Sequence, residues 1–343
     1  MSESLSHRID VHNHSVLPSY RTALRAKLGD SVRLPQWSPT LAVEVMDRHR
    51  ITAAVTSLSH PGTHLGDDAQ ALGLAQACND ESAANSERFP RLGAFATLPL
   101  PATDLACDEA VRALDVLGLD GVCLLASYQG TYLGHPDFDP LLEVLDERAA
   151  VVLVHPTVHP STKEVSLTVP NFMVEYPFDT TRAAVNLMFA DALERFPRIR
   201  FILAHAGGTL PYLTWRISTI ATYQMSDPPA SERFLRDNYR TALIDRLGRV
   251  TPQVVTELVG RFYYDTALAP STTHLSALLS ITDAGHIVFG SDWPYAYENF
   301  VRDEVAELDQ QTVFSAPDMA KINSENALGL FPRLAKAIAG QTP

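Results

Sequence analysis

The chain has 343 residues, of which 46% are hydrophobic and 20% charged, and its formal net charge is −13. This composition suits one large packed domain, and the negative charge argues against nucleic acid or an anionic membrane surface as a partner. No apolar run approaches the ~20 residues of a membrane span, and no signal peptide is visible at the start. We therefore expect a cytoplasmic protein whose cysteines, Cys78, Cys107 and Cys123, are reduced and buried.

Eight short apolar runs recur along the chain, and most of them precede a segment with helical spacing of apolar residues. Several runs, such as 151–154, are nearly continuous in apolar residues, which indicates a parallel sheet covered on both faces. In chain order the predicted strands are 9–14, 52–58, 91–98, 121–127, 150–155, 199–205, 261–266 and 286–291. The predicted helices between them include 41–49, 68–88, 104–117, 139–148 and 181–195.

Eight such pairs predict a (β/α)₈ barrel, an α/β fold, with 1–343 forming a single domain. A doubly wound sheet is the alternative, but no Gly-x-Gly-x-x-Gly follows the first strand. Two connections, 15–39 and 156–180, are too long for simple turns, and both follow the carboxyl ends of strands, where barrel enzymes build their sites. A helix over 319–328 and a short helical cap are expected at the end of the chain.

Side chains that can ligate metals stand at the ends of four predicted strands. The first strand ends in His12 and His14, which point to the same side because they are two residues apart. The fifth ends in His155, the sixth in His205, and the eighth is followed by Asp292. In a barrel all five side chains converge on the mouth at the carboxyl ends of the strands, which predicts a metal site there.

The number of ligands separates the types of site. Three imidazoles and one carboxylate make a mononuclear site with a position left for water or substrate. A two-metal site would need a further anionic ligand at a strand end, such as a glutamate or a carbamylated lysine. None of the four lysines closes a predicted strand, and the fourth strand ends in Leu-Leu-Ala-Ser. The sequence therefore favours one metal ion.

Four motifs of the chain resemble the amidohydrolase superfamily: His-x-His, Val-His-Pro, His-Ala-Gly-Gly and Ser-Asp-Trp-Pro at the four strand ends. The closest branch is that of aminocarboxymuconate-semialdehyde decarboxylase and related aromatic-acid decarboxylases. Segments 178–182 and 201–216 are most similar to the 6-methylsalicylate decarboxylase type. The resemblance implies a homodimer and the following roles: metal ligands His12, His14, His155 and Asp292, acid/base residue His205, and Arg216 reaching the neighbouring subunit's site to hold a substrate carboxylate.

The chain departs from the muconate enzyme in one respect. That enzyme has a further substrate-binding arginine in the helix after Trp-x-Pro, whereas 37–44 contains none here. A monocarboxylate with an apolar ring is therefore expected rather than a dicarboxylate. Trp37, Phe172, Trp293 and Tyr295 are candidates to line the ring, or otherwise belong to the core.

The predicted reaction is metal-dependent, non-oxidative decarboxylation of an ortho-hydroxy aromatic acid such as 6-methylsalicylate. The ring carbon gains a proton before CO₂ leaves, and Asp292 and His205 are both candidates for the acid. Zinc suits the ligands best, with manganese and cobalt as alternatives. A mononuclear hydrolase of a lactone or amide is the chief alternative, which the missing second-metal ligand disfavours. A non-catalytic metal-binding barrel is the third, which the two long connections disfavour.

Overall fold

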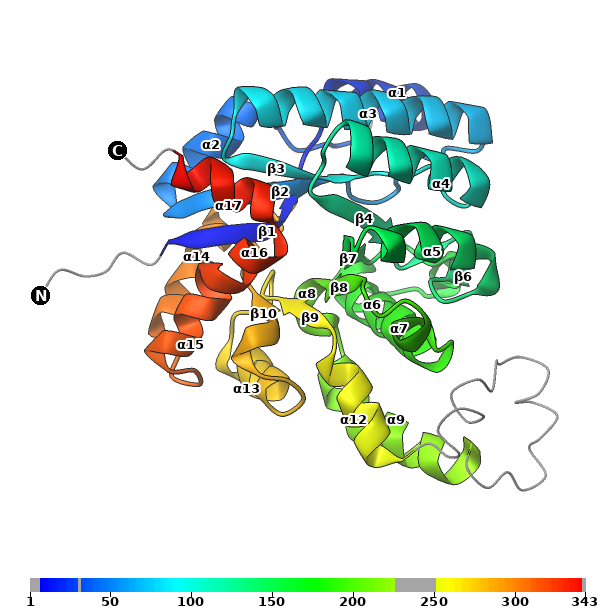
Figure 1. Ribbon diagram of the computed structural model, residues 1–343, viewed down its shortest axis with the longest axis vertical. Coiled ribbons are helices and arrows are strands. Elements are labelled where there is room, and N and C mark those ends of the chain that lie inside the picture. The colour runs from blue at the N-terminus through cyan, green and yellow to red at the C-terminus, as the bar shows by residue number, and fades with distance from the viewer. Residues whose placement is uncertain (1–6, 30–31, 226–250, 341–343) are drawn as a thin grey trace, which may run out of the picture.

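The computed structural model describes residues 7–29, 32–225 and 251–340. Eight parallel strands follow one another in a single sheet: β1 (Arg8–His14), β2 (Ile51–Ser57), β3 (Leu92–Ala96), β4 (Gly121–Leu125), β7 (Val151–His155), β8 (Arg200–Leu203), β9 (Tyr263–Asp265) and β10 (Ile287–Val288). The first and last strands also meet, because Val11 N donates to Phe289 O at 2.9 Å and Asn13 bridges to Trp293. The sheet is thus a barrel ringed by helices (Figure 1), which confirms the (β/α)₈ prediction and excludes the doubly wound sheet.

Helices cover the outside of the barrel, and some of them begin at a side-chain cap. The Ser38 side chain accepts from Leu41 N before α2, and the Asp67 side chain accepts from Gln70 N before α3. No helix of the described part of the chain is both long and apolar enough to cross a membrane. The helices are α1 (Pro18–Leu28), α2 (Pro39–Arg48), α3 (Asp68–Arg88), α4 (Thr103–Val111), α5 (Asp139–Glu147), α6 (Phe172–Phe189), α7 (Ala192–Arg195), α8 (Ala204–Gly207), α9 (Leu210–Met225), α12 (Pro252–Gly260), α13 (Thr272–Leu279), α14 (Glu298–Gln310), α15 (Ala316–Ala320), α16 (Asn326–Leu330) and α17 (Pro332–Ala339).

The two long connections contain helices that the sequence pattern did not predict. Helix α1 lies within 15–39, and α6 begins at Phe172 rather than at residue 181. Helix α6 continues through Pro177, a residue that normally ends a helix because it lacks an N–H and its ring clashes with the preceding turn. Strand β4 is also shorter than expected, and a small hairpin of β5 (Ser127–Tyr128) and β6 (Thr131–Tyr132) follows it.

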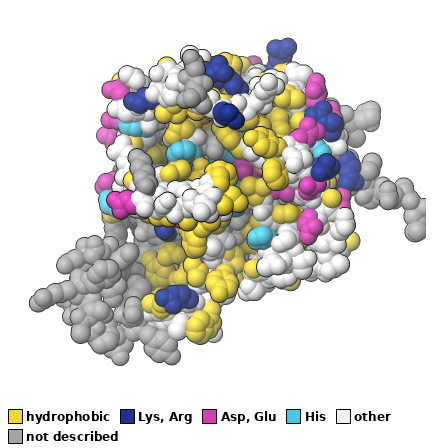
Figure 2. Space-filling model, turned by 180° about the vertical axis from the view of Figure 1, so that it is seen from behind, with side chains coloured by type: hydrophobic (Ala, Val, Ile, Leu, Met, Phe, Trp, Pro, Cys, Tyr) yellow, Lys and Arg dark blue, Asp and Glu magenta, His cyan; other side chains and the backbone are white. Residues whose placement is uncertain are grey.

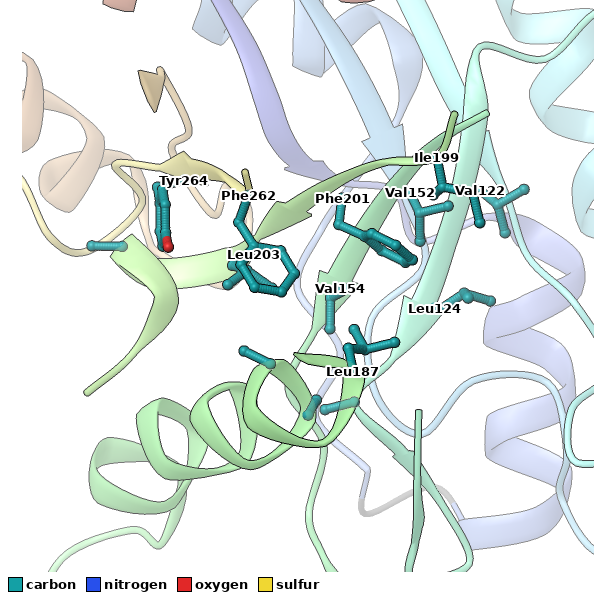
Figure 3. Packing of buried hydrophobic residues seen from close by; sticks show 14 of the residues in the cluster. Val122, Leu124, Val152, Val154, Leu187, Ile199, Phe201, Leu203, Phe262 and Tyr264 are labelled. Atoms are coloured by element: carbon teal, nitrogen blue, oxygen red, sulfur yellow. The ribbon is translucent and has the colours of Figure 1, made fainter. Parts of the chain in front are cut away.

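Side chains of the barrel strands alternate between two packed layers. Leu124 and Val154 point outward, toward helix residues such as Leu187 (Figure 3). The preceding residues, Cys123 and Leu153, point into the barrel. The large outer cluster therefore joins the helices to the sheet, and the smaller inner cluster fills the barrel.

The chain ends in the helical cap that the sequence predicted. Leu330 of α16, Leu334 of α17 and Phe331 between the two helices belong to the inner cluster. Arg333 pairs with Asp120, which lies just before β4, at 2.6 Å. The cap therefore closes the barrel at the amino ends of its strands and leaves the carboxyl ends open for a site.

Candidate metal centre

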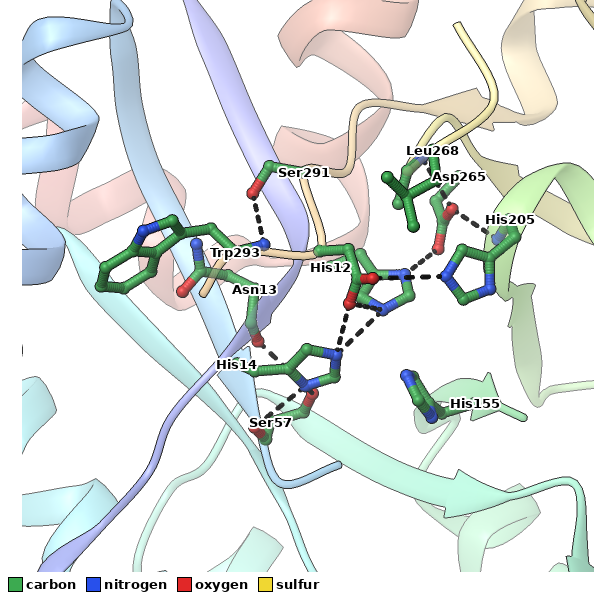
Figure 4. Close-up of polar contacts among 12 residues, drawn as sticks. His12, Asn13, His14, Ser57, His155, His205, Asp265, Leu268, Ser291 and Trp293 are labelled. Carbon is green, nitrogen blue, oxygen red and sulfur yellow. Dashed lines mark hydrogen bonds and ion pairs between the residues drawn. The ribbon is translucent and has the colours of Figure 1, made fainter. Parts of the chain in front are cut away.

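The four predicted metal ligands meet at the carboxyl end of the barrel. His12 and His14 come from β1, His155 from the end of β7, and Asp292 from the loop after β10. All four are buried, and their ligand atoms lie within 4.8 Å of one another. His14 Nε2 is 2.9 Å from Asp292 Oδ1, and the Nε2 atoms of His12 and His14 are 3.1 Å apart (Figure 4).

An irregularity in β1 aims both of its histidines at this point. Ile9 and Val11 belong to the inner cluster of the barrel, so simple alternation would direct His12 and His14 away from the barrel axis. The pairing with β2 has one extra residue in β1 within 10–13. Such a bulge reverses the side that the following residues face, and the two histidines therefore point inward.

The outer ring nitrogen of each histidine ligand already has a partner. His14 Nδ1 lies 3.3 Å from Ser57 O, and His155 Nδ1 lies 2.7 Å from Pro156 O. His12 Nδ1 meets a carboxylate, described below. Carboxylate and carbonyl oxygens only accept hydrogen bonds, so the Nδ1 atoms of His12 and His155 carry the hydrogen and their Nε2 atoms keep a lone pair for the centre. His14 Nδ1 also lies 3.1 Å from Ser57 Oγ, which can accept from it while donating to Asn13 O. The donor set therefore fits one divalent ion.

Burial and the neighbouring charges give Asp292 and His155 the protonation states that metals need. At His12 burial acts to lower the pKa, but the carboxylates of Asp265 and Asp292 outweigh it and hold the pKa well above its ordinary value. Burial alone would raise the pKa of Asp292, but the neighbouring imidazoles of His12, His14 and His205 outweigh it and hold the pKa well below its ordinary value. Burial, together with the three neighbouring histidines, lowers the pKa of His155 well below its ordinary value. An ionised aspartate and a neutral imidazole are the forms that bind a metal.

His205 lies beside the ligands and is held there by an unusual turn. Strand β8 ends at Leu203, so His205 is not at the strand end as expected but in α8, with φ 56° and ψ 52°. The next three residues, Ala-Gly-Gly, also have positive φ, and a Cβ on Gly208 would lie 1.9 Å from Pro177 O. The turn brings His205 Nε2 to 3.7 Å from Asp292 Oδ2.

The predicted pocket aromatics have different surroundings. Tyr295 packs edge-on against His14 with ring centroids 5.3 Å apart. The Tyr295 hydroxyl is buried, and burial raises the pKa of Tyr295 to about 12. Trp293 is 5% exposed and its ring is directed away from the histidines (Figure 4). Trp37 is partly buried against the core, and Phe172 is 56% exposed.

Sequence reasoning missed two residues near the centre. The ring of Tyr176 lies 6.2 Å from that of His155, and no sequence signal marked it because its segment was interpreted as a loop. Asp265 lies 2.7 Å from His12 Nδ1. Asp265 could have been found, because it stands near the end of a predicted strand just as the ligands do. Arg216 is exposed on α9, and its role toward a neighbouring subunit stays a prediction.

Comparison with known proteins identifies the family. The family model for amidohydrolases matches residues 9–333. The chain belongs to the amidohydrolase family. It is 37% identical to the 6-methylsalicylic acid decarboxylase acuB of Aspergillus aculeatus, over 98% of this chain and 99% of that one. It is 24% identical to a 2-amino-3-carboxymuconate-6-semialdehyde decarboxylase of Dictyostelium discoideum, over 85% of this chain and 75% of that one.

A solved structure shares the fold of this amidohydrolase. The dihydroxybenzoic acid decarboxylase of Polaromonas sp. JS666, with bound manganese and the inhibitor 2-nitroresorcinol, superposes with a TM-score of 0.76. It is 22% identical and covers 95% of this chain and 97% of that one. The shared fold agrees with the resemblance to the decarboxylase branch, which the 37% identity to a 6-methylsalicylic acid decarboxylase confirms.

The described residues of the amidohydrolase contain one group of side chains that could hold a metal ion. Strand β4, where a second-metal ligand was sought in the sequence, ends at Leu125 and is followed by Ala126 and Ser127. Neither residue offers an anionic ligand. The geometry of the described part thus agrees with a mononuclear centre.

Proposed function

We propose that this amidohydrolase is a metal-dependent decarboxylase of an ortho-hydroxy aromatic acid, such as 6-methylsalicylate or a related hydroxybenzoate. The observation that carries the proposal is the 37% identity to a 6-methylsalicylic acid decarboxylase over nearly the full length of both chains. A match of that extent spans every strand end that bears a site residue. The single cluster of three histidines and one aspartate, with His205 beside it, supports the same reaction.

In this reaction the ring carbon that bears the carboxylate takes up one proton. The bond to the carboxylate carbon then breaks, its electron pair returns to the ring, and CO₂ leaves. A divalent ion held by His12, His14, His155 and Asp292 would supply Lewis acidity and a template for the carboxylate and phenol oxygens. His205 and Asp292 are the proton-carrying residues. His205 Nε2 lies 3.7 Å from Asp292 Oδ2, so a small movement of either side chain brings them within hydrogen-bond distance for proton transfer.

Zinc is our first proposal for the metal ion, because three imidazoles and a carboxylate are donors that it prefers. Manganese is the second, since the structurally similar dihydroxybenzoic acid decarboxylase holds it. Elemental analysis of protein purified without added metal, followed by reconstitution with each ion, decides between them. Greater occupancy and turnover with manganese or cobalt would replace zinc.

The substrate pocket is proposed to be lined by the aromatic residues named from the sequence. Tyr295 has the strongest support, since its ring packs on His14 and its buried hydroxyl has no partner among the described residues. Trp37, Phe172 and Trp293 remain proposals of the same kind. An apolar ring with one carboxylate suits such walls better than a dicarboxylate does.

A cytoplasmic homodimer is the proposed assembly. Helices α6 and α9 lie in contact and expose large apolar side chains, among them Met173, Tyr212 and Trp215, the last two 87% and 76% exposed. Figure 2 shows hydrophobic side chains gathered on one face of the molecule. Arg216 follows Trp215 on α9, so a second copy that covers this surface would bring Arg216 close to its partner.

A mixing experiment tests the shared site. Arg216→Ala and Asp292→Asn are each expected to be nearly inactive, whereas the mixed and re-associated proteins regain activity. In a mixed dimer one site then has both an intact Asp292 and an intact Arg216 from the partner. A dimer whose mixtures stay inactive would refute the role of Arg216, and a monomer by light scattering would refute the dimer.

The reaction is tested by incubating the metal-loaded protein with 6-methylsalicylate and a panel of hydroxybenzoates in D₂O. We expect release of CO₂ and one deuterium on the ring carbon that lost it. A panel of lactones and amides serves as the comparison. Ring opening of a lactone without CO₂ release from any acid would favour the hydrolase alternative.

A further inference from the structure

Asp265 is a fully buried carboxylate that touches both halves of the site. It ends β9, and its Oδ2 lies 2.7 Å from His12 Nδ1. Its other oxygen, Oδ1, accepts from the backbone N–H groups of His205 at 2.8 Å and Ala267 at 3.1 Å. Figure 4 shows Asp265 between the rings of His12 and His205.

The first contact determines which nitrogen of His12 is free. An ionised carboxylate only accepts hydrogen bonds, so His12 Nδ1 carries a hydrogen and Nε2 presents its lone pair to the centre. His12 differs in this from His155, whose outer nitrogen meets a main-chain carbonyl oxygen, and from His14, whose outer nitrogen lies near the carbonyl and the hydroxyl of Ser57. The negative charge of Asp265 also makes the His12 imidazole a stronger donor.

The second contact holds the turn that carries His205. His205 and Ala206 both have left-handed backbone conformations, which are strained for residues with a side chain. The hydrogen bond from His205 N to Asp265 anchors the start of this turn. His205 Nε2 lies 3.7 Å from Asp292 Oδ2, and the position of the turn sets this distance. A displaced turn would therefore move the His205 ring away from Asp292.

We propose that Asp265 is a positioning residue that prepares His12 for metal binding and His205 for proton transfer at the same time, one through each carboxylate oxygen. The inference rests on the proposed metal-dependent function and deepens it. It assigns the alignment of both His12, a metal ligand, and His205, the acid/base residue, to the side chain of Asp265 on β9. A loss at this residue therefore affects metal affinity and the His205 turn together.

Asp265→Asn distinguishes the proposed hydrogen-bonding role of Asp265 from a role in packing alone. The amide has nearly the same shape but only one accepting oxygen. If that oxygen faces His12, the NH₂ group points at the N–H groups of His205 and Ala267. These groups are all hydrogen-bond donors, so both backbone hydrogen bonds are lost. If it faces the turn, the NH₂ group points at His12 Nδ1 and favours the wrong tautomer. Either orientation loses one of the two functions.

The experiment measures metal affinity by competition with a chelator, for zinc and manganese separately. If the amide oxygen faces the turn, Asp265→Asn is expected to weaken metal binding about 10- to 100-fold. If the oxygen faces His12, the His205 amide is expected to exchange hydrogen faster instead. Glu109→Gln is the matched control, because Glu109 is equally buried but pairs with Arg112 and Asn79 in another region. Folded Asp265→Asn in which both the metal affinity and the exchange of the His205 amide are unchanged would overturn the proposal.

Wild-type protein provides a second test that does not depend on the variant folding. Long-range ¹H–¹⁵N spectra of the zinc-loaded, histidine-labelled enzyme report which nitrogen of His12 bears hydrogen. Hydrogen on Nδ1 is expected, and hydrogen on Nε2 would overturn the proposal. Neither readout needs turnover: absence of CO₂ release refutes the proposed function, whereas the metal affinity and the His12 spectrum decide the role of Asp265.

Discussion

The two ends of the barrel use the same strands for opposite purposes. At the amino end, Phe331 and Leu334 of the cap join the inner cluster, and Phe331 packs edge-on against Phe95 with ring centroids 5.6 Å apart. At the carboxyl end, buried histidines and aspartates replace the apolar side chains. The contrast separates stability from chemistry, because apolar packing can hold the barrel while polar groups that are costly to bury gather at the other end.

The largest effect is expected at the carboxyl end from Asp292→Asn. The change alters a residue of the metal centre that is also a proposed proton carrier, so turnover should fall about 10⁴-fold while the fold persists. Steady-state kinetics and circular dichroism measure the two outcomes. Asp303→Asn, at an exposed aspartate on α14, should remain near wild type. An active Asp292→Asn enzyme would mean that the site is wrongly assigned.

His205→Ala should distinguish metal binding from acid/base chemistry at the carboxyl end of the barrel. Turnover should fall about 10³-fold, because the proposed proton carrier beside Asp292 is lost. Metal content by elemental analysis should stay unchanged, since His205 is not among the ligands. His286→Ala, at the amino end of β10, is the control and should retain activity. Loss of the metal with His205→Ala would make His205 a ligand instead.

Phe331→Ala probes the apolar end. Removing a fully buried ring from the inner cluster should lower the free energy of unfolding by about 3–5 kcal/mol, measured by chemical denaturation. Metal affinity of the remaining folded protein should be unchanged. Phe300→Ala, at an exposed phenylalanine, should be nearly neutral. If Phe331→Ala also weakens metal binding, the two ends are coupled rather than separate.

The smallest effect concerns His60, which follows β2 and contacts Thr157 at 2.6 Å. Burial lowers the pKa of His60 from 6.5 to about 4. Between these values the unfolded chain binds a proton that the folded protein excludes, so stability falls as pH drops from 6.5 toward 4. His60→Gln should flatten this loss, measured by thermal unfolding in one metal state. The exposed His135→Gln should leave the slope unchanged, and an equal slope in His60→Gln would contradict the prediction.

Much of the fold was predictable because the strands are marked by their composition. Continuous apolar runs such as that of β7 are typical of parallel strands buried on both faces, and eight of them with intervening helices indicate a barrel. The start of α6 was not predictable in the same way. Pro177 lies inside this helix, and local sequence cannot reveal that tertiary packing offsets the lost hydrogen bond.

The site was predictable where a functional residue ends a strand. His12, His14, His155 and Asp292 could be grouped because a barrel brings all carboxyl strand ends to one mouth, whatever their separation in sequence. Tyr176 and the exact position of His205 could not be derived. The first depends on the unpredicted part of α6, and the second on a left-handed turn beyond the end of β8.

By itself the sequence determined the barrel, the set of ligands and the resemblance to aromatic-acid decarboxylases, since each depends on residue types at strand ends. Only the tertiary structure decided how those ligands are aimed. The bulge in β1 turns His12 and His14 inward, and Asp265, 253 residues from His12 in the chain, determines which ring nitrogen faces the centre. Such orientation depends on hydrogen bonds between distant strands, which no local pattern records.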